Sequence, residues 1–147
     1  MIHLKNYKLT NNITVGQLLS WISNPTEESK SHILKLIEHR IENRYLKHIK
    51  PNYVDSGFLI MAICCFIIET IQSFKEGEED THGKGRKIFQ DFFNSNSEIF
   101  PGFGEISDDF YWLIRCGILH QSETKNGWRI LRNGKLLNTK EYSINAR

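Results

Sequence analysis

The sequence is poor in several features that would place it in a specialised class of protein. It has three cysteines in 147 residues and no CxxC pair, and two of the cysteines, Cys64 and Cys65, are adjacent and so rarely bridge each other. This pattern predicts a reducing compartment, no disulfide framework and no zinc site. With only three prolines, a Pro-rich disordered chain is not expected, and the formal net charge of +2 says nothing by itself about nucleic acid.

Long hydrophobic runs are also scarce. The N-terminal segment MIHLKNYKLT lacks the apolar region of a signal peptide. The longest apolar stretch, Gly57 to Ile68, has about twelve residues, whereas a helix that spans a bilayer needs about twenty. We therefore expect a soluble, cytoplasmic protein with no membrane partner.

The composition that is present is that of an ordinary globular domain. Hydrophobic residues make up 39% of the chain and charged residues 24%, and residues 1–147 are predicted to form one domain. Basic residues gather in two regions, Lys30 to Lys50 and Arg115 to Arg147. These regions are interpreted either as a phosphate-attracting surface or as solvated surface without a ligand. Under the first interpretation Arg40, Arg44 and Lys47, which share a helix face, bind RNA.

The first half of the chain predicts two helices. Thr14 and Gln17 can form a capping box before a helix over Val15 to Ser23. A second helix is expected with Asn24 as its N-cap, Pro25 at its first position, Glu27 and Glu28 in its first turn, and an end near Ile49. Its apolar residues at helical spacing predict one buried stripe, which consists of Leu34, Ile37, Ile41 and Tyr45.

The second half predicts three more helices and a hairpin. A helix over 55–74, apolar nearly all round and ended by Gly77, is expected at the centre of a bundle. A fourth helix over 86–94 carries crowded apolar residues, and a fifth begins at Ser107 or Asp108 as N-cap. The pair Asn133–Gly134 predicts a β-hairpin over Trp128 to Asn138. The predicted fold is all-α, a bundle of four to five helices with a small C-terminal β-hairpin.

Arg115 and His120 stand at the expected end of the fifth helix, which is predicted to bury Tyr111, Ile114 and Ile118. Five residues at 100° each separate the two side chains by roughly 140°, so they converge only if the helix ends or distorts between them. Gly117 favours such a distortion. In a purely structural interpretation, His120 interacts with the free carbonyls of the helix end and Arg115 pairs with Glu69 or Asp109.

The functional interpretation of this pair is acid–base chemistry on RNA. A histidine titrates near neutrality, so it can remove the 2′-hydroxyl proton or protonate the leaving 5′-oxygen. An arginine can hold a phosphate through two hydrogen bonds and stabilise a five-coordinate phosphorus. The histidines and Asp80 offer no convincing metal site, and the GKGRK segment lacks the remainder of a phosphate loop.

The stretch DDFYWLIRCGILHQSETKNGWRI, from Asp108 to Ile130, resembles the signature region of the HEPN superfamily of small helical domains, which carries an Arg-x(4–6)-His motif. The phrase RCGILHQSETKNGW is similar to a subgroup found in bacterial defence and plasmid-borne proteins. The resemblance implies a bundle of four or five helices that forms a homodimer, with two Arg–His motifs facing each other across a cleft. It implies a metal-independent, cofactor-free ribonuclease with Arg115 and His120 as catalytic residues. Glu69, Asp109 and Ser122 are the candidate supporting polar residues of the site.

Other members of the superfamily are noncatalytic, which leaves a second interpretation open. They serve as homodimeric modules that bind RNA, nucleotides or proteins. Cys116 stands where catalytic members often have a polar residue, and Ser122 where one toxin subgroup has tyrosine. Resembling proteins also commonly continue into a further helix after the hairpin, which these 147 residues do not include. An antitoxin or another defence-system protein is the expected protein partner.

Overall fold

The structure is a computed structural model that describes residues 4–49 and 56–146. The chain is mostly helical, with a small three-stranded sheet near the C-terminus. Its described residues fall into two compact units, residues 4–49 and 56–146.

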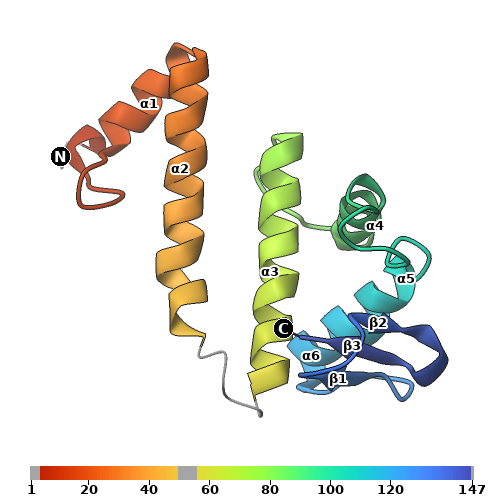
Figure 1. The fold of residues 1–147 in the computed structure, drawn as a ribbon. Coiled ribbons are helices and arrows are strands. Elements are labelled where there is room, and N and C mark those ends of the chain that lie inside the picture. Colours follow the sequence, from red (N-terminus) through yellow and green to blue (C-terminus); the bar gives the residue numbers. More distant parts are fainter. Residues whose placement is uncertain (1–3, 50–55, 147) are drawn as a thin grey trace. The chain divides into compact units, whose positions relative to one another are not determined.

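Helices α1 and α2 of the first unit are labelled in Figure 1, and its described residues also form short 3₁₀ turns. In chain order they are η1 (Leu4–Asn6), α1 (Val15–Ser23), α2 (Glu27–Arg44) and η2 (Leu46–His48). Helix α1 begins and ends as predicted. The backbone N–H of Gln17 donates to the Thr14 hydroxyl at 3.3 Å, and the Gln17 side chain accepts from the Thr14 N–H at 2.9 Å. The predicted capping box is therefore confirmed.

The start of α2 differs from the prediction. Asn24 is the residue that ends α1, because its backbone N–H donates to the Ser20 carbonyl. The N-cap of α2 is Thr26, whose hydroxyl accepts from the Ser29 N–H at 3.1 Å. Glu27 and Glu28 lie in the first turn, as predicted. The expectation that Asn24 caps the helix and Pro25 opens it is wrong, because Asn24 already belongs to the preceding helix.

Helix α2 also ends earlier than predicted, at Arg44 rather than Ile49. After it the backbone tightens into the 3₁₀ turn η2, and a ring nitrogen of His48 lies 3.1 Å from the Asn43 carbonyl. A side chain that meets a late carbonyl of a helix in this way helps to end it. The predicted buried stripe is wrong at Leu34, which is 66% exposed, while Ile37, Ile41 and Tyr45 are half-buried.

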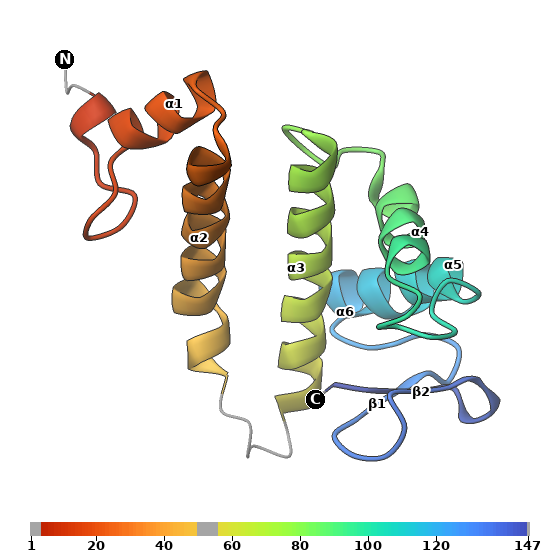
Figure 2. The ribbon, with the colours of Figure 1, turned by 45° about the horizontal axis from the view of Figure 1, so that its top comes forward.

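The second unit is built on one long helix. Figure 2 shows α3 (Gly57–Glu76) with α4, α5 and α6 lying along one side of it. The other elements follow in chain order: α4 (Gly85–Ser95), α5 (Ser107–Asp109), η4 (Phe110–Arg115), α6 (Cys116–Gln121), β1 (Arg129–Leu131), β2 (Leu137–Asn138), η5 (Thr139–Glu141) and β3 (Ser143–Asn145).

Helix α3 buries one face and exposes the other, unlike the fully buried bundle-centre helix that we predicted. Ile60, Met61 and Cys65 are buried, whereas Leu59 is 58% exposed and Phe66 is 44% exposed. The predicted start near Asp55 falls outside the described residues. At its other end Gly77 adopts φ +68°, a left-handed conformation that suits glycine and ends the helix as predicted.

By length and composition alone, α3 is able to cross a membrane. The helix has 20 residues and a mean hydropathy of 1.9 over its most apolar window, one third of which is buried. The apolar stretch recognised in the sequence, Gly57 to Ile68, is therefore only part of a longer apolar helix. This is weak evidence for a membrane span, because the core helix of a soluble protein meets the same criteria.

An aromatic cluster forms the core of the second unit. The ring of Phe93 lies 5.0 Å from that of Phe103 and 5.0 Å from that of Phe110, between centroids. Phe89 joins them at 5.4 Å from Phe110. All four residues are at most 3% exposed. The apolar crowding predicted for the fourth helix therefore lies in the core, and the loop before α5 contributes Phe103 to it.

The fifth predicted helix consists of α5, η4 and α6 in succession. Neither predicted cap is used, since the N-cap position is Ile106 and the Asp108 carboxylate accepts from Arg86 instead. The segment Phe110–Arg115 winds as a π-helix, in which the Cys116 N–H donates to the Tyr111 carbonyl five residues earlier. Ile114 and Ile118 are buried as predicted, and Tyr111 is half-buried.

The predicted hairpin does not form, although both of its strands exist. Strand β3 lies between β1 and β2, parallel to β1 and antiparallel to β2, so that the order is β1–β3–β2. Ile144 at the centre of β3 is opposite Ile130 in β1 and Leu137 in β2. All three residues of β3 are buried. The hairpin prediction is wrong because the segment after Asn138 returns and inserts between the two strands.

Candidate functional site

The guanidinium of Arg115 is held at the surface of the second unit by a carboxylate from another helix. Arg115 is the last residue of η4, and its Nε donates to Oε1 of Glu69 on α3 at 2.6 Å. The side chains are 18% and 15% exposed, respectively. Of the two partners that the structural interpretation allowed, the structure selects Glu69; Asp109 is exposed on the short helix α5. The ion pair joins the motif helix to the longest helix of the unit.

Electrostatics keep Arg115 charged. Burial, the largest single influence, lowers its pKa, but the hydrogen bond and charge of Glu69, with smaller contributions from Cys116, outweigh it and raise the pKa overall. Arg115 therefore stays protonated at every pH at which the protein is folded. A fixed positive group of this kind, partly withdrawn from water, is suited to bind an anion.

Two neighbours on the same helix support the guanidinium. The Cζ atom of Arg115 lies 5.6 Å from the centroid of the Tyr111 ring, within the range of a cation–π interaction. The Sγ atom of Cys116 lies 4.0 Å from Nη1 of Arg115, and Cys116 is 6% exposed. Burial is the main cause that raises the pKa of Tyr111, followed by Cys116. The Tyr111 ring and the Cys116 thiol thus pack against the charged guanidinium.

His120 has very different surroundings. It is exposed in the last turn of α6, and among the described residues no hydrogen bond or ion pair involves its ring. The helix end is closed by backbone instead: Ser122, at φ +56°, donates its N–H to the Ile118 carbonyl at 3.0 Å. His120 is therefore not needed as a cap. The exposed Ser122 ends the helix through its backbone N–H and not through its side chain.

The helix does not distort between the two motif residues. The π-helical winding precedes Arg115, and residues 116–121 are regular α-helix. Five α-helical steps turn the chain by roughly 140° beyond a full turn and advance it by about 7.5 Å. Arg115 consequently lies against α3 while His120 faces solvent, and a single chain does not bring the two side chains together.

Gly117, between the two, has a role that its sequence position does not reveal. A Cβ built on it would lie 2.4 Å from the Glu123 carbonyl oxygen and 3.3 Å from the Thr124 Cα. The loop after α6 therefore folds back against the bare backbone of the helix, where the Lys125 N–H donates to the Leu113 carbonyl at 2.9 Å. The close approach of this loop explains why the helix has a glycine at position 117 better than the helix distortion predicted from the sequence.

The three candidate RNA-binding residues belong to the first unit. Arg40 is half-buried and Arg44 exposed on α2, and the exposed Lys47 in η2 donates to the Asn43 side chain at 2.9 Å. Arg40 and Arg44 lie four residues apart on α2, but Lys47 lies beyond the end of that helix, so the prediction that all three share one helix face is wrong for Lys47. No group of three or more His, Cys, Asp or Glu side chains that could hold a metal ion occurs among the residues that the structure describes.

Comparisons with known proteins return nothing: no family model matches the chain, and no curated protein or solved structure shows significant similarity to it. The candidate site therefore rests on its own geometry. Its best-defined part is the group formed by Glu69, Tyr111, Arg115 and Cys116, with the exposed His120 one and a half turns further along the helix.

Proposed function

We propose that this protein is a metal-independent endoribonuclease of a bacterial toxin or defence system, a homodimer of the HEPN kind. The observation that carries the proposal is the guanidinium of Arg115, which is partly buried and oriented by Glu69. That hydrogen bond uses Nε, and Nη1 makes a long contact of 4.0 Å with the Cys116 thiol, so Nη2 is the nitrogen most readily offered to a phosphate. Under this proposal the protein works in the cytoplasm, with RNA as substrate and an antitoxin or defence-system protein as partner.

The proposed site combines two copies of the chain. Because Arg115 and His120 point in different directions on one helix, the histidine that meets a phosphate bound at Arg115 comes from the second copy. Exposed apolar side chains flank the motif: Trp112 is 53% exposed and Leu119 is 48% exposed on the same helix. Phe66, 44% exposed, lies one turn before Glu69. Apolar surface of this kind favours an interface, and a two-fold interface presents the same patch from both copies.

The proposed reaction is an intramolecular transesterification. A neutral His120 removes the proton of the ribose 2′-hydroxyl, whose oxygen attacks the adjacent phosphorus. Arg115 stabilises the additional negative charge of the five-coordinate phosphorus. The P–O bond to the 5′-oxygen then breaks, and that oxygen takes a proton from solvent, while the second copy's His120 releases to solvent the proton that it took from the 2′-hydroxyl. The products are a 2′,3′-cyclic phosphate and a 5′-hydroxyl.

The second candidate is a noncatalytic homodimeric module that binds RNA, nucleotides or a protein. One observation favours it: Glu69 already neutralises Arg115, and Cys116 offers the site a buried thiol rather than a polar group. Under this alternative the same surface binds its ligand without turnover, and His120 contributes only to binding.

The test is to incubate the purified protein with RNA in the presence of EDTA and to analyse the ends of the fragments. We expect cleavage that leaves 2′,3′-cyclic phosphate and 5′-hydroxyl ends, because neither motif residue acts through a metal in the proposed reaction. RNA that is bound but remains intact would establish the noncatalytic alternative. Light scattering should give a mass of twice 17.2 kDa; a strict monomer contradicts the composite site.

A further inference from the structure

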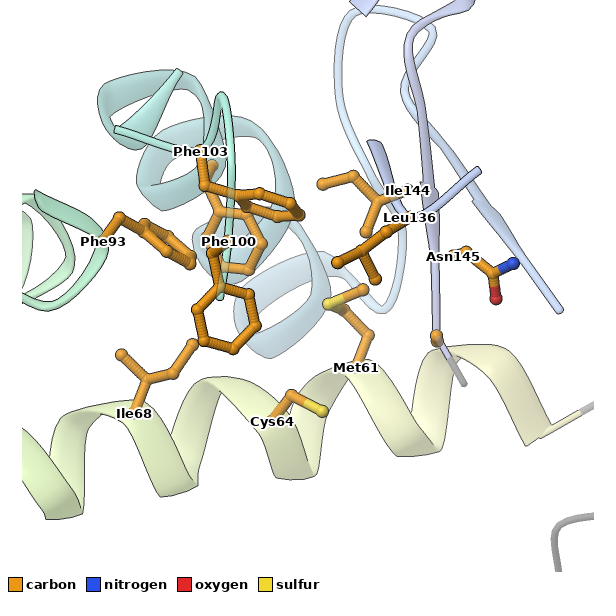
Figure 3. A pocket seen from close by; sticks show the side chains of 11 residues that line it. Met61, Cys64, Ile68, Phe93, Phe100, Phe103, Leu136, Ile144 and Asn145 are labelled. Carbon is orange, nitrogen blue, oxygen red and sulfur yellow. The ribbon is translucent and has the colours of Figure 1, made fainter. Parts of the chain in front are cut away.

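The second unit contains an apolar cavity at the edge of its aromatic core, separate from the Arg115 group. Its volume is about 100 Å³. Figure 3 shows the side chains of Phe93, Phe100 and Phe103 on one side of it, Met61 on α3 below them, and Leu136 and Ile144 on the other side. Cys64, Ile68, Phe110, Asn145 and Ala146 complete the lining.

The lining offers almost no polar partner. Asn145 is the one residue of the lining with a polar amide, and in Figure 3 this amide points away from the other side chains. Its Nδ2 donates to the Gly134 carbonyl at 3.1 Å. Burial raises the pKa of the Cys64 thiol, which is therefore uncharged. The Oδ1 of Asn145 is buried without a hydrogen-bond partner among the described residues, but a buried water needs two to four polar partners, so the interior of this cavity disfavours water.

The exposure of the lining residues shows where the cavity opens. Met61, Phe93, Phe103 and Ile144 are at most 3% exposed and form its interior. Cys64, Phe100 and Leu136 are only half-buried and form its mouth. Apart from the weakly hydrogen-bonding thiol of Cys64, these three side chains provide no group that would hold the polar backbone of a docking peptide. The mouth is thus suited to a small free molecule.

We propose that this cavity is a binding site for one small uncharged molecule, a single aromatic ring or a group of similar size and polarity. An apolar cavity of roughly 150 Å³ accepts benzene or xenon, and the thioether of Met61 can adapt its rotamer to a ring in a somewhat smaller space. The three phenylalanine rings of the wall offer edge and face contacts to such a ring. A charged ring is excluded, because no group in the lining would compensate its charge.

The experiment uses the 147-residue chain with its methionine methyl groups labelled with ¹³C. The chain has two methionines, and Met61→Leu assigns the signal of Met61. Benzene and xenon are expected to shift the Met61 signal in a saturable way and to raise the midpoint of thermal unfolding as their concentration rises. Benzoate, which carries the same ring with a charge, is expected to do neither.

Two filling variants and a matched control test the location. Cys64→Leu and Leu136→Phe occupy the mouth and are expected to weaken benzene binding by about tenfold or more. Ala62→Leu adds similar volume to the same helix at a residue outside the lining and is expected to bind as the natural chain does. An unshifted Met61 signal at the solubility limit of benzene in the folded natural chain overturns the proposal. Equal binding of benzoate, or unchanged binding in a folded filling variant, also overturns it.

Discussion

The two residues of the Arg–His motif lie five positions apart on one helix but in contrasting surroundings. Arg115 is more than four-fifths buried as a side chain, is paired with Glu69 and lies over the Tyr111 ring. His120 is exposed, and the part of the chain that the structure describes provides no partner for its ring. The side chain of Arg115 is therefore part of the packing of the fold, whereas the position of His120 is set by the helix backbone alone.

This contrast separates stability from activity. A change at Arg115 disturbs both the ion pair between two helices and any phosphate bound there. A change at His120 leaves the packing untouched and affects only what the imidazole does. Measurements of unfolding and of RNA cleavage on matched variants can therefore test whether the two residues differ in this way.

The largest effect is expected for His120→Ala on activity. The cleavage rate should fall by about 10²–10⁴-fold, because an oriented acid–base histidine contributes that much to catalysis. The free energy of unfolding, measured with denaturant, should change by less than about 0.5 kcal/mol, as at other exposed positions. Gln121→Ala, at the exposed neighbouring residue, is the control and should retain both activity and stability. Loss of stability in His120→Ala would mean that the imidazole has a structural partner.

Arg115→Ala is expected to abolish cleavage and also to lower the free energy of unfolding by about 1–3 kcal/mol, because it leaves the carboxylate of Glu69 partly buried and unpaired. Chemical denaturation of the purified variant gives this value. The double variant Arg115→Ala with Glu69→Gln removes the unpaired charge and should recover part of the stability but none of the activity. An Arg115→Ala variant as stable as the natural chain would contradict the structural role of the pair.

Gly117→Ala tests the chain between the two motif residues. Alanine favours the helix by about 0.5–1 kcal/mol, but its Cβ would lie 2.4 Å from the Glu123 carbonyl oxygen, and overpacking of this kind costs about 1–3 kcal/mol. The net effect should be a loss of about 0.5–2 kcal/mol in the free energy of unfolding. Leu119→Ala, exposed on the same helix, is the comparison and should lose less. A stabilised Gly117→Ala variant would show that the loop moves away freely.

The smallest expected effect is in the first unit. If Arg40, Arg44 and Lys47 bind RNA, each replacement by alanine should weaken binding and reduce the slope of log affinity against log salt by about one unit for every phosphate that the variant no longer neutralises. Titrations at several salt concentrations measure that slope. A replacement of Lys35, which is exposed on the same helix, serves as the control for bulk charge. Unchanged slopes would make the basic surface of this unit ordinary solvated surface.

Features fixed by local chemistry were predictable from the sequence. The capping box of Thr14 and Gln17 needs only four consecutive residues, and the helix end at Gly77 needs one glycine with positive φ. For Arg115, the sequence predicted one of two carboxylate partners, Glu69 or Asp109. Glu69 rather than Asp109 is the partner because of how α3 packs against the motif helix. That packing cannot be predicted from the spacing of residues within one helix.

The features that were missed depend on contacts between distant residues. Strand β3 has three residues, two of them the polar Ser143 and Asn145, so neither hydrophobicity nor length marks it as the central strand of a sheet. The π-helical winding of Phe110–Arg115 had no sequence signal, because apolar residues follow one another there without a break. The return of the loop onto Gly117 likewise depends on residues beyond the helix.

The position of β3 in the sheet has a consequence for how the protein is made. A hairpin can form as soon as its two strands have left the ribosome, but β1 and β2 both pair with residues 143–145, which are translated after them. During synthesis the two earlier strands emerge without their shared neighbour, and Trp128, 4% exposed in the finished fold, emerges with them. The sheet can therefore be completed only after residues 143–145 have been translated, when Ile144 takes its place between Ile130 and Leu137.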